Sequence, residues 1–358
     1  MQTASPRRAP TGSIRRHERH HVDGRGLRIK QAFETLDTFP ALGESRTRLL
    51  TALAGSRPSL PGAAVAIESD IALTCGVLRL ANGPMHRPAR ADSVTAAVEA
   101  LDPRAIVDFA NAARSFDYFE HAGVWAGVPE SMRLHALATQ RAAARVASAI
   151  NYSGRERLAA TSLLHDIGKL VLARAYPGYP AAILRGARTP DERARLERRE
   201  LGVDHAVIGG VLLARWGVPA TLSGAIEHHH DPHADGEGAI LRLADMLAHY
   251  ERGAHVSSTE MLHAAAALEL GQQDLRELIY TLHGAAAPRQ RLGGDCPLTE
   301  RELGLLRQLA EGSVYKQIAQ QLGLSASTIR THLHNIYGKL GVVNRAQAVL
   351  VASERGWL

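Results

Sequence analysis

Apolar side chains between residues 31 and 284 recur at spacings of three and four. Leu73, Val77 and Leu80 illustrate this spacing, and the stretch LRLADMLAHY repeats it much later in the chain. An α-helix that buries one face has this spacing, because positions i, i+3 and i+4 lie on the same side. Convincing alternation of polar and β-branched residues, which would predict strands, does not occur here. The pattern therefore predicts a body made of helices, with prolines at several helix ends.

A separate and shorter pattern begins after residue 296. Thr299 and Glu302 have the spacing of an N-terminal capping box ahead of a first helix. A second helix is expected to stop at Gly323, and Ser325 is placed to cap a third helix, SASTIRTHLHNIYGKLG. Two helices joined by a short turn that contains glycine form a helix-turn-helix. The apolar stripe expected to be buried in the third helix consists of Ile329, Leu333, Ile336 and Leu340.

The chain has 358 residues, which is enough for two or three domains. We expect a disordered basic tail over residues 1–28, because Arg, His, Gly and Pro abound there without periodicity. Two prolines and a glycine pair predict a linker over residues 285–295. These assignments leave a helical domain over residues 29–284 and a second domain over residues 296–358. The charged segment 186–200 is expected to be an exposed excursion from the first domain.

Composition and charge narrow the function classes. Aromatic residues are only 4% of the chain, so the core must be built from aliphatic side chains. The net charge of +6 is concentrated at the two ends, which suggests that a polyanion would be met there. Two cysteines far apart do not support a disulfide framework. No apolar run is long enough for a bilayer or a signal peptide, so we expect a cytoplasmic protein without a membrane partner.

The polar face of the third helix near the carboxy terminus is suited to nucleic acid. Thr328, Arg330, Thr331 and His334 lie opposite the apolar stripe, and Lys339 lies at the end of the helix. Hydroxyl, guanidinium and imidazole groups can donate to phosphates and to base edges in the major groove of DNA. The sequence therefore predicts that this helix contacts double-stranded DNA.

The motifs LTEREL, IAQQLGLSASTIRTHLHNIYGKLGV and NRAQAV resemble the LuxR-type (GerE) helix-turn-helix domain over nearly all of the last 62 residues. The resemblance implies a small four-helix domain whose third helix enters the major groove, with Arg330, Thr331 and His334 facing the bases. It also implies that the fourth helix, over residues 346–355, pairs two copies, so a homodimer is expected. The positions that match contacts to the sugar-phosphate backbone are Lys316, Thr328, Lys339, Asn344 and Arg345.

The body carries a constellation of histidines and aspartates. His165 and Asp166 are adjacent in the apolar segment TSLLHDIGKLVL, where unpaired polar groups would be costly to bury. A metal ion and mutual hydrogen bonding are both open as ways to satisfy them. Imidazoles and carboxylates in these numbers are typical of a di-metal hydrolytic site. The other members of the constellation are His135, His205, His228, His229, His230 and Asp245.

Order and spacing resemble the HD superfamily of metal-dependent phosphohydrolases. The resemblance implies a basic ligand set of His135, His165, Asp166 and Asp245. It adds His205, His229 and His230 where two-metal relatives have further ligands, and Lys169 where a phosphate-contacting lysine occurs. If a divalent ion such as Mn, Fe or Mg is bound, Asp166 would bridge two ions and a coordinated water would become the nucleophile. Asp166 and Lys169 would then be the catalytic residues.

Three longer stretches resemble a more specific branch, the HDOD (HD-related output domain) family: IESDIALTCGVLRLANGPMHRPARADSVTAAVEALDPRAI, GVDHAVIGGVLLARWGVPATLSGAIEHHHDP and LELGQQDLRELIYTL. That family is regarded as a non-catalytic signalling or scaffolding relative whose ligand set has often decayed, whereas this chain keeps every basic ligand position. Cyclic-di-GMP hydrolysis is disfavoured, because no GYP loop follows the histidines and Ser131 offers no carboxylate. The remaining histidines, among them His249 and His255, are expected at the surface or satisfied in the core.

The sequence thus predicts an all-α bacterial transcription regulator: an HD-like helical bundle of the HDOD type followed by a LuxR-type helix-turn-helix domain. An unknown small molecule or protein would act on the body and thereby control DNA binding. No cofactor is certain, and a divalent metal in the body stays an open alternative. A rival interpretation is an HD-type phosphohydrolase with a DNA-binding output domain, and a scaffold for another signalling protein is a third. The question of catalysis stays open, and the HDOD resemblance favours a non-catalytic body.

Overall fold

The computed structural model places most of the chain. It describes residues 26–36, 39–83, 90–116, 130–176, 178–179, 183, 187–282, 296–310, 315–340, 342, 348–349, 351–352, 355 and 357–358, without the side chains of residues 116, 130, 131, 315, 316, 326, 327, 330 and 334. Helices make up most of this part of the chain, which confirms the all-α class. The strands found there are β1 (Ala41–Leu42) and β2 (Ser115–Phe116), which form one short parallel pair.

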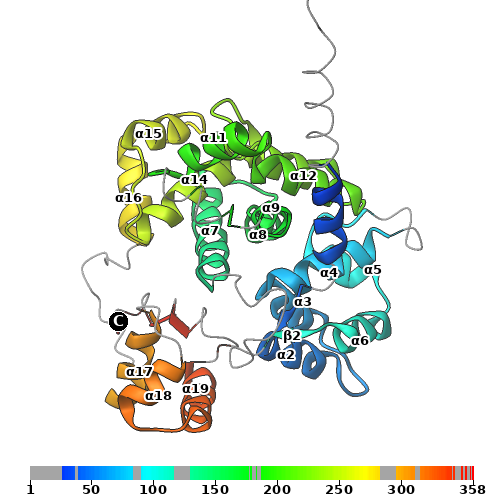
Figure 1. The fold of residues 1–358 in the computed structure, drawn as a ribbon, viewed down its shortest axis with the longest axis vertical. Helices are drawn as coiled ribbons and strands as arrows, with labels where there is room; N and C mark the ends of the chain where they lie inside the picture. Colours follow the sequence, from blue (N-terminus) through cyan, green and yellow to red (C-terminus); the bar gives the residue numbers. More distant parts are fainter. Residues whose placement is uncertain are drawn as a thin grey trace, which may run out of the picture.

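The first part of the body is a layer of short helices (Figure 1). Side chains of Ser59, Asp70, Ser93 and Asp102 cap helices here by accepting from backbone N–H groups, which explains where these helices begin. The layer consists of a helix over residues 26–36 and of α2 (Gly43–Leu53), α3 (Leu60–Glu68), α4 (Ile71–Ala81), α5 (Val94–Ala100) and α6 (Pro103–Ala112).

The rest of the body consists of the helices that surround the predicted histidine constellation. They are α7 (Glu130–Ala149), α8 (Arg155–Leu164), α9 (Ile167–Ala175), α11 (Pro190–Leu201), α12 (His205–Arg215), α13 (Ala220–Glu227), α14 (Gly236–Glu251), α15 (Ser258–Ala266) and α16 (Gln272–Leu282). One hydrophobic cluster joins the first layer to α8, α9 and α12, and a second joins α7 to α14, α15 and α16. Both clusters are built mainly from Ala, Leu, Ile and Val, as the low aromatic content requires.

The last part of the chain has a hydrophobic cluster of its own. Its helices are α17 (Glu300–Ala310), α18 (Tyr315–Leu322) and α19 (Ala326–Leu340). The predicted stripe of α19 is confirmed, since Ile329, Leu333 and Ile336 are buried and Leu340 is half-buried. Ala348 and Ala352, from the expected fourth helix, are helical and buried in the same cluster.

The predicted caps of this domain are also found. The backbone N–H of Thr299 donates to Oε2 of Glu302 at 2.8 Å, and the N–H of Glu302 donates to Oγ1 of Thr299 at 3.3 Å, which makes a capping box. Ser325 Oγ accepts from the N–H of Thr328 at 3.1 Å at the start of α19. Gly323 ends α18 with a φ of 63°, where a residue without Cβ is favoured.

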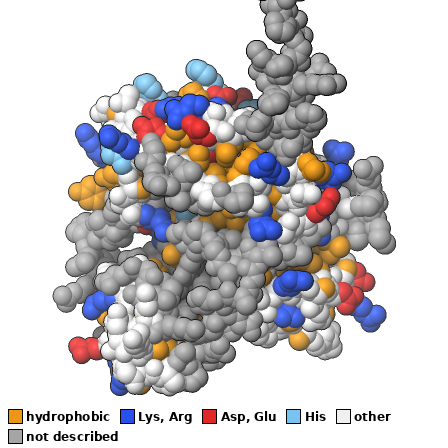
Figure 2. All heavy atoms as spheres, in the orientation of Figure 1, with side chains coloured by type: hydrophobic (Ala, Val, Ile, Leu, Met, Phe, Trp, Pro, Cys, Tyr) orange, Lys and Arg blue, Asp and Glu red, His pale blue; other side chains and the backbone are white. Residues whose placement is uncertain are grey.

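Two expectations need correction. The disordered tail cannot extend to residue 28, because residues 26–28 begin the first helix. The segment 186–200 is not simply exposed, because α11 buries Asp191, Ala194 and Glu197 while its outer face contributes to the charged edge seen over α11 and α15 in Figure 2. The expected linker 285–295 and residues 1–25 of the tail lie outside the described residues. Within the described residues, each helix is too short or too polar to span a bilayer.

Candidate metal centre and candidate DNA-binding face

The structure brings all seven predicted metal ligands together inside the body. His135 comes from α7, His165 and Asp166 form the break between α8 and α9, His205 begins α12, and Asp245 comes from α14. His229 and His230 follow the end of α13. All seven are buried. The chain therefore gathers its imidazoles and carboxylates from five separate elements into one interior cluster, which we call the histidine–aspartate centre.

The first half of the centre lies between α7, α9 and α14. Nε2 of His135 is 2.8 Å from Oδ1 of Asp245 and 3.2 Å from Nε2 of His165. The same nitrogen is 3.7 Å from Oδ2 of Asp166. His135, His165 and Asp166 each have one donor atom that lies within 4.8 Å of the donor atoms of the other two. This spacing could hold a metal ion.

The second half of the centre contains the three additional histidines. Nε2 of His205 lies 3.1 Å from Nε2 of His230 and 3.3 Å from Oδ1 of Asp166. His229 joins these two histidines in a group whose donor atoms lie within 4.8 Å of one another. Asp166 therefore directs one carboxylate oxygen toward each half, as the HD resemblance implied for a bridging ligand.

Four histidines are held by hydrogen bonds from Nδ1, on the side of the ring away from the centre. The acceptors are Ser162 O for His165 (2.8 Å), Glu197 Oε2 for His205 (2.6 Å), Ile226 O for His229 (2.6 Å) and Asp191 Oδ1 for His230 (2.9 Å). A proton on Nδ1 leaves the lone pair of Nε2 pointing inward. This is the usual arrangement around histidines that ligate a metal.

The pKa shifts of the same groups favour binding of a cation. Burial, together with the neighbouring histidines, holds the pKa of His229 and of His230 well below the usual value, so both are neutral at pH 7. Burial would raise the pKa of Asp166, but His165, Lys169 and His205 outweigh it and hold that pKa well below its usual range. Burial alone would lower the pKa of His205. The neighbouring carboxylates of Glu197 and Asp166 outweigh burial and raise that pKa to about 9.

The residues fit a cation because the centre has acceptor atoms that face one another. With Nδ1 of His205 and of His230 both donating outward, their Nε2 lone pairs meet at 3.1 Å. Nε2 of His229 is buried without a hydrogen-bond partner. Lone pairs in this arrangement repel unless a positive charge lies between them, and either a proton or a metal ion would supply it. The raised pKa of His205 corresponds to a proton in this position, whereas the set of imidazole and carboxylate donors suits a metal ion.

Lys169 lies at the edge of the centre. Its ammonium group is 2.5 Å from Oδ2 of Asp166, and the side chain is 15% exposed. In this position Lys169 neutralises the central carboxylate. A mixed-charge cavity of about 510 Å³ approaches the other edge, where His230, Asp191 and Arg242 contribute to its lining. The centre is thus buried but has a polar route to its second half.

The predicted DNA-contacting residues can be placed only in part. The side chains of Lys316, Arg330 and His334 lie outside the described residues, as do Asn344 and Arg345. Thr331 is exposed on α19, and the hydroxyl of Thr328 lies 2.8 Å from that of Ser325 at the start of the helix. These positions agree with a polar outer face on α19.

Lys339 has an internal partner that the sequence did not suggest. Its ammonium group donates to Oε1 and Oε2 of Glu302 at 2.9 and 2.7 Å, so α17 and α19 are joined by an ion pair. Glu302 is also the capping-box carboxylate, and the Lys339 side chain is 38% exposed. Lys339 therefore has a structural role whether or not it also meets a phosphate.

Comparison with known protein families identifies the family of the helical body. The HDOD domain family matches residues 39–232, which is more than half of the chain. The chain belongs to the HDOD family. The MmoQ response regulator of Methylococcus capsulatus shares the HDOD fold, with a TM-score of 0.52 and 24% identity over 68% of this chain and 98% of that structure. A virulence factor of Campylobacter jejuni is similar, with a TM-score of 0.51 and 20% identity over 72% of this chain and 94% of that structure.

The part of the chain that follows the HDOD domain matches a second family, the luxR family of bacterial regulatory proteins, over residues 296–352. The transcriptional regulatory protein DesR of Bacillus subtilis is 41% identical over 61 residues, which are 17% of this chain and 31% of DesR. A nitrate/nitrite response regulator protein homolog of Haemophilus influenzae is 45% identical over 58 residues, 16% of this chain and 28% of that protein. The chain thus spans about a third of these curated relatives and carries a LuxR-type helix-turn-helix domain.

Several residues that shape the centre of the HDOD domain were missed by the sequence analysis. Asp191 and Glu197 hold two of the histidines, and Glu197 also accepts from the hydroxyl of Tyr179 at 2.6 Å. Arg242 donates to Asp191 at 2.9 Å. The sequence of α11 carries no signal for this burial, because Asp191 and Glu197 lie among many other charged residues.

His249, which was expected at the surface or satisfied in the core, lies against the first half of the centre. Its Nε2 is buried without a hydrogen-bond partner and lies 3.5 Å from Oδ1 of Asp245, and its ring centroid is 4.2 Å from that of His135. His135, Asp245 and His249 form a third group with donor atoms within 4.8 Å of one another. The spacing of four between Asp245 and His249 puts both on one face of α14, which the sequence could have shown.

Proposed function

We propose that this protein is a transcription regulator whose HDOD domain controls DNA binding by the helix-turn-helix domain. The state of the histidine–aspartate centre is the controlling variable. The observation that carries the proposal is the inward-facing donor set, in which four histidines are held by Nδ1 hydrogen bonds, in a chain that also has a LuxR-type domain. A buried cluster of this kind is expensive to maintain unless a cation occupies it.

The cation in this proposal is a divalent metal ion. His135, His165, Asp166 and Asp245 would hold one ion, and His205, His229 and His230 would hold a second that shares Asp166. Imidazole-rich ligands favour Mn or Fe over Mg, which prefers oxygen ligands and retained water. When bound, such an ion lowers the pKa of a coordinated water. The ligands themselves would come from α7, the break between α8 and α9, α12, the end of α13 and α14, so occupancy would fix how these helices pack.

DNA binding is proposed for the outer face of α19. Arg330, Thr331 and His334 would reach base edges, because they lie on the polar face of the helix expected in the major groove. Lys316, Thr328, Lys339, Asn344 and Arg345 would hold the sugar-phosphate backbone. Two copies of the chain would bind together, since the fourth helix is expected to pair protomers and a dimer reads two half-sites.

The experiment joins metal content to DNA affinity in the full chain. Purified protein is analysed for bound metal, and its affinity for a duplex selected from random sequences is measured at fixed salt with Mn added or removed by a chelator. We expect bound Mn or Fe and at least a tenfold change in DNA affinity on its removal, which is about 1.4 kcal/mol. His165→Ala and Asp166→Ala should lose both metal and response, while His255→Ala, an exposed histidine of the body, should keep both.

Two outcomes would reject parts of this proposal. Wild-type protein that takes up no Mn or Fe would reject the metal-bound centre. Metal uptake without any effect on DNA affinity would reject the control of the helix-turn-helix domain by the centre. If the selected duplex and a scrambled competitor bind equally at moderate salt, the assignment as a sequence-specific regulator fails altogether.

A second candidate function is hydrolysis of a phosphodiester or nucleotide. The favouring observation is the position of Lys169 beside Asp166, together with the cavity of about 510 Å³ that reaches His230. Turnover of bis(4-nitrophenyl) phosphate with added Mn tests it. Turnover that is lost in Asp166→Ala and kept in His255→Ala would establish the hydrolase, and its absence in metal-loaded protein would leave the regulatory role.

A further inference from the structure

The two halves of the histidine–aspartate centre differ in what holds their histidines from outside. In the second half, carboxylates accept from Nδ1 of His205 and of His230, and both carboxylates come from α11. In the first half, Nδ1 of His165 donates to a backbone carbonyl, and Nδ1 of His135 is buried with no hydrogen-bond partner among the described residues. Charged outer partners are therefore concentrated on the second half.

Glu197 is the more tightly engaged of these two outer partners. Its Oε2 accepts from Nδ1 of His205 at 2.6 Å and from the backbone N–H of His205 at 2.8 Å, which fixes the orientation of the ring. The Glu197 side chain is fully buried, and Oε1 accepts from the hydroxyl of Tyr179 at 2.6 Å. Asp191, in contrast, shares its charge with Arg242 at 2.9 Å. A carboxylate behind a ligating imidazole makes the imidazole a stronger donor, and its loss costs about 10- to 100-fold in metal affinity.

The shared ligand Asp166 is more available to the second half. Lys169 donates at 2.5 Å to Oδ2, the oxygen that lies toward His135 and His165. Oδ1 is buried without a hydrogen-bond partner in the described part of the chain and lies 3.3 Å from Nε2 of His205. An ion in the first half therefore competes with an ammonium group for Asp166, whereas an ion in the second half meets the oxygen that Lys169 leaves open.

The carboxylates of the two halves also balance differently. Asp245 gives the first half a second carboxylate ligand, but the ammonium group of Lys169 offsets one negative charge there. Glu197 adds a negative charge beside the second half without occupying a coordination position. Lys169 thus reduces the attraction of the first half for a cation, and Glu197 increases that of the second half.

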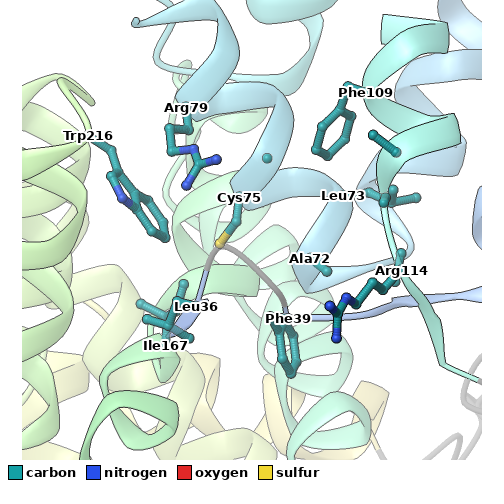
Figure 3. A pocket seen from close by; sticks show the side chains of 14 residues that line it. Leu36, Phe39, Ala72, Leu73, Cys75, Arg79, Phe109, Arg114, Ile167 and Trp216 are labelled. Atoms are coloured by element: carbon teal, nitrogen blue, oxygen red, sulfur yellow. The ribbon is translucent and has the colours of Figure 1, made fainter. Parts of the chain in front are cut away.

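The polar cavity of about 510 Å³ reaches the same half of the centre. Its lining includes His230 and the Asp191–Arg242 pair. Another cavity of about 220 Å³ lies next to the centre, but the described residues that line it are mainly apolar, and Figure 3 shows Ile167 and Trp216 on its wall. Because an ion is costly to move through apolar surroundings, ions would arrive through the polar cavity, at the second half.

We propose that the second half of the centre has the higher affinity for a divalent ion and fills first, with Glu197 and Asp191 of α11 as the residues that position its histidines. The inference rests on the proposed metal-bound centre and adds the order of filling. At limiting metal, the chain would hold one ion on the three histidines of the second half and on Asp166. The first half would fill later, because an ion there must displace Lys169 from Asp166.

Titration of the full chain with Mn, followed by the electron paramagnetic resonance signal of free Mn, measures both metal equivalents. We expect a tight and a weak equivalent whose dissociation constants differ by about tenfold or more. His230→Ala should remove the tight equivalent and keep the weak one, and His135→Ala should do the reverse. The opposite assignment, or two equivalents of equal affinity in the wild type, would overturn the order of filling.

Glu197→Gln tests the role of α11. The substitution keeps the size of the side chain and an oxygen acceptor for His205 but removes the charge, so it should weaken the tight equivalent about 10- to 100-fold and leave the weak one unchanged. Glu200→Gln, exposed on the same helix, should change neither equivalent. A purely structural role of Glu197 would weaken both equivalents or neither, and either result would reject it as a positioning residue. If Glu197→Gln does not fold, Asp191→Asn makes the same test, because it should weaken the tight equivalent alone.

Failure of this inference is distinct from failure of the proposed function. Wild-type protein that takes up no Mn rejects the metal-bound centre and the order of filling together. Uptake of Mn that changes DNA affinity, but with two equal equivalents, rejects the order of filling and keeps the proposed function. A single equivalent supports the inference if it is lost in His230→Ala and kept in His135→Ala, and it overturns the inference if the two variants behave the other way round.

Discussion

Gly168 of α9 lies directly against His205 of α12. A Cβ atom on Gly168 would be 1.9 Å from the carbonyl oxygen of His205 and 2.8 Å from the backbone nitrogen of Gly209. The two helices therefore meet backbone to backbone, and only a residue without a side chain allows this approach. The contact matters for the centre because Asp166 lies two residues before Gly168, and His205 supplies the imidazole that faces it at 3.3 Å.

Gly168→Ala should push α9 and α12 apart. Because the atoms in the way are backbone atoms, the clash cannot be relieved by a side-chain rotation, and we expect a loss of about 1–3 kcal/mol or more in the free energy of unfolding. Metal uptake should weaken as well. Gly224→Ala in α13 is the matched control, because a Cβ there meets nothing within 4 Å and alanine favours a helix by up to about 1 kcal/mol. Equal denaturation midpoints for the two variants would contradict this account.

Lys169→Met should raise the affinity of the centre for a divalent metal. The ammonium group, 2.5 Å from Asp166, competes with a metal ion for the same carboxylate and repels it. Its removal should tighten Mn binding about tenfold in a competition titration, with Lys30→Met, an exposed lysine, as control. If Lys169 serves only to contact a phosphate, metal affinity will not change and any effect will appear in phosphodiester turnover.

The sequence predicted which histidines and aspartates meet in the centre but not the residues that hold them. His165 and Asp166 stand out because two polar residues interrupt an apolar segment, and the other ligands follow in the order of the HD pattern. Asp191 and Glu197 do not stand out, because they lie in a charged helix whose burial depends on partners elsewhere in the chain, namely Arg242, His205 and His230. Such pairing is tertiary, and no local pattern encodes it.

The helix-turn-helix domain was easier to predict because its signals are local. A capping box, a glycine at positive φ and an apolar stripe each act within a few residues, and each was found where the sequence put it. The ion pair between Lys339 and Glu302 was missed, because its partners are 37 residues apart and meet only when α17 packs against α19. Because of this ion pair, a Lys339 variant can lower the stability of the domain as well as its affinity for DNA.

Variants of α19 and of Glu302 should separate base reading from backbone contact. Arg330→Ala should relax the preference among duplexes. Lys339→Ala should weaken all duplexes alike and reduce the slope of log affinity against log salt by about one. Glu302→Gln removes the internal partner of Lys339, so it should lower domain stability without weakening DNA binding. Lys339 is purely structural if Lys339→Ala and Glu302→Gln lower stability equally and neither alters the salt slope.

Glu68, at the end of α3, should make the HDOD domain less stable as pH rises. Burial, with a further contribution from the charge of Glu156, raises the pKa of Glu68 from 4.5 to about 7. The folded state therefore binds this proton more tightly than the unfolded state, so its contribution to stability is full below pH 4.5 and is lost as pH rises toward 7. Glu68→Gln should raise the denaturation midpoint at pH 8 more than at pH 5. Glu99→Gln, exposed on α5, is the control, and a pH-independent effect of Glu68→Gln would contradict the assignment.

His249 should act as an additional ligand on the first half of the centre. Its buried Nε2 has no hydrogen-bond partner and lies 3.5 Å from Asp245, so a metal ion held by His135 and Asp245 is within reach of it. His249→Ala should weaken binding of one metal equivalent about tenfold in a Mn titration and leave the second unchanged, because His205, His229 and His230 are untouched. His263→Ala, an exposed histidine of α15, should affect neither equivalent. If His249→Ala binds both equivalents as tightly as wild type, His249 only packs against His135, and its orphaned nitrogen needs another explanation.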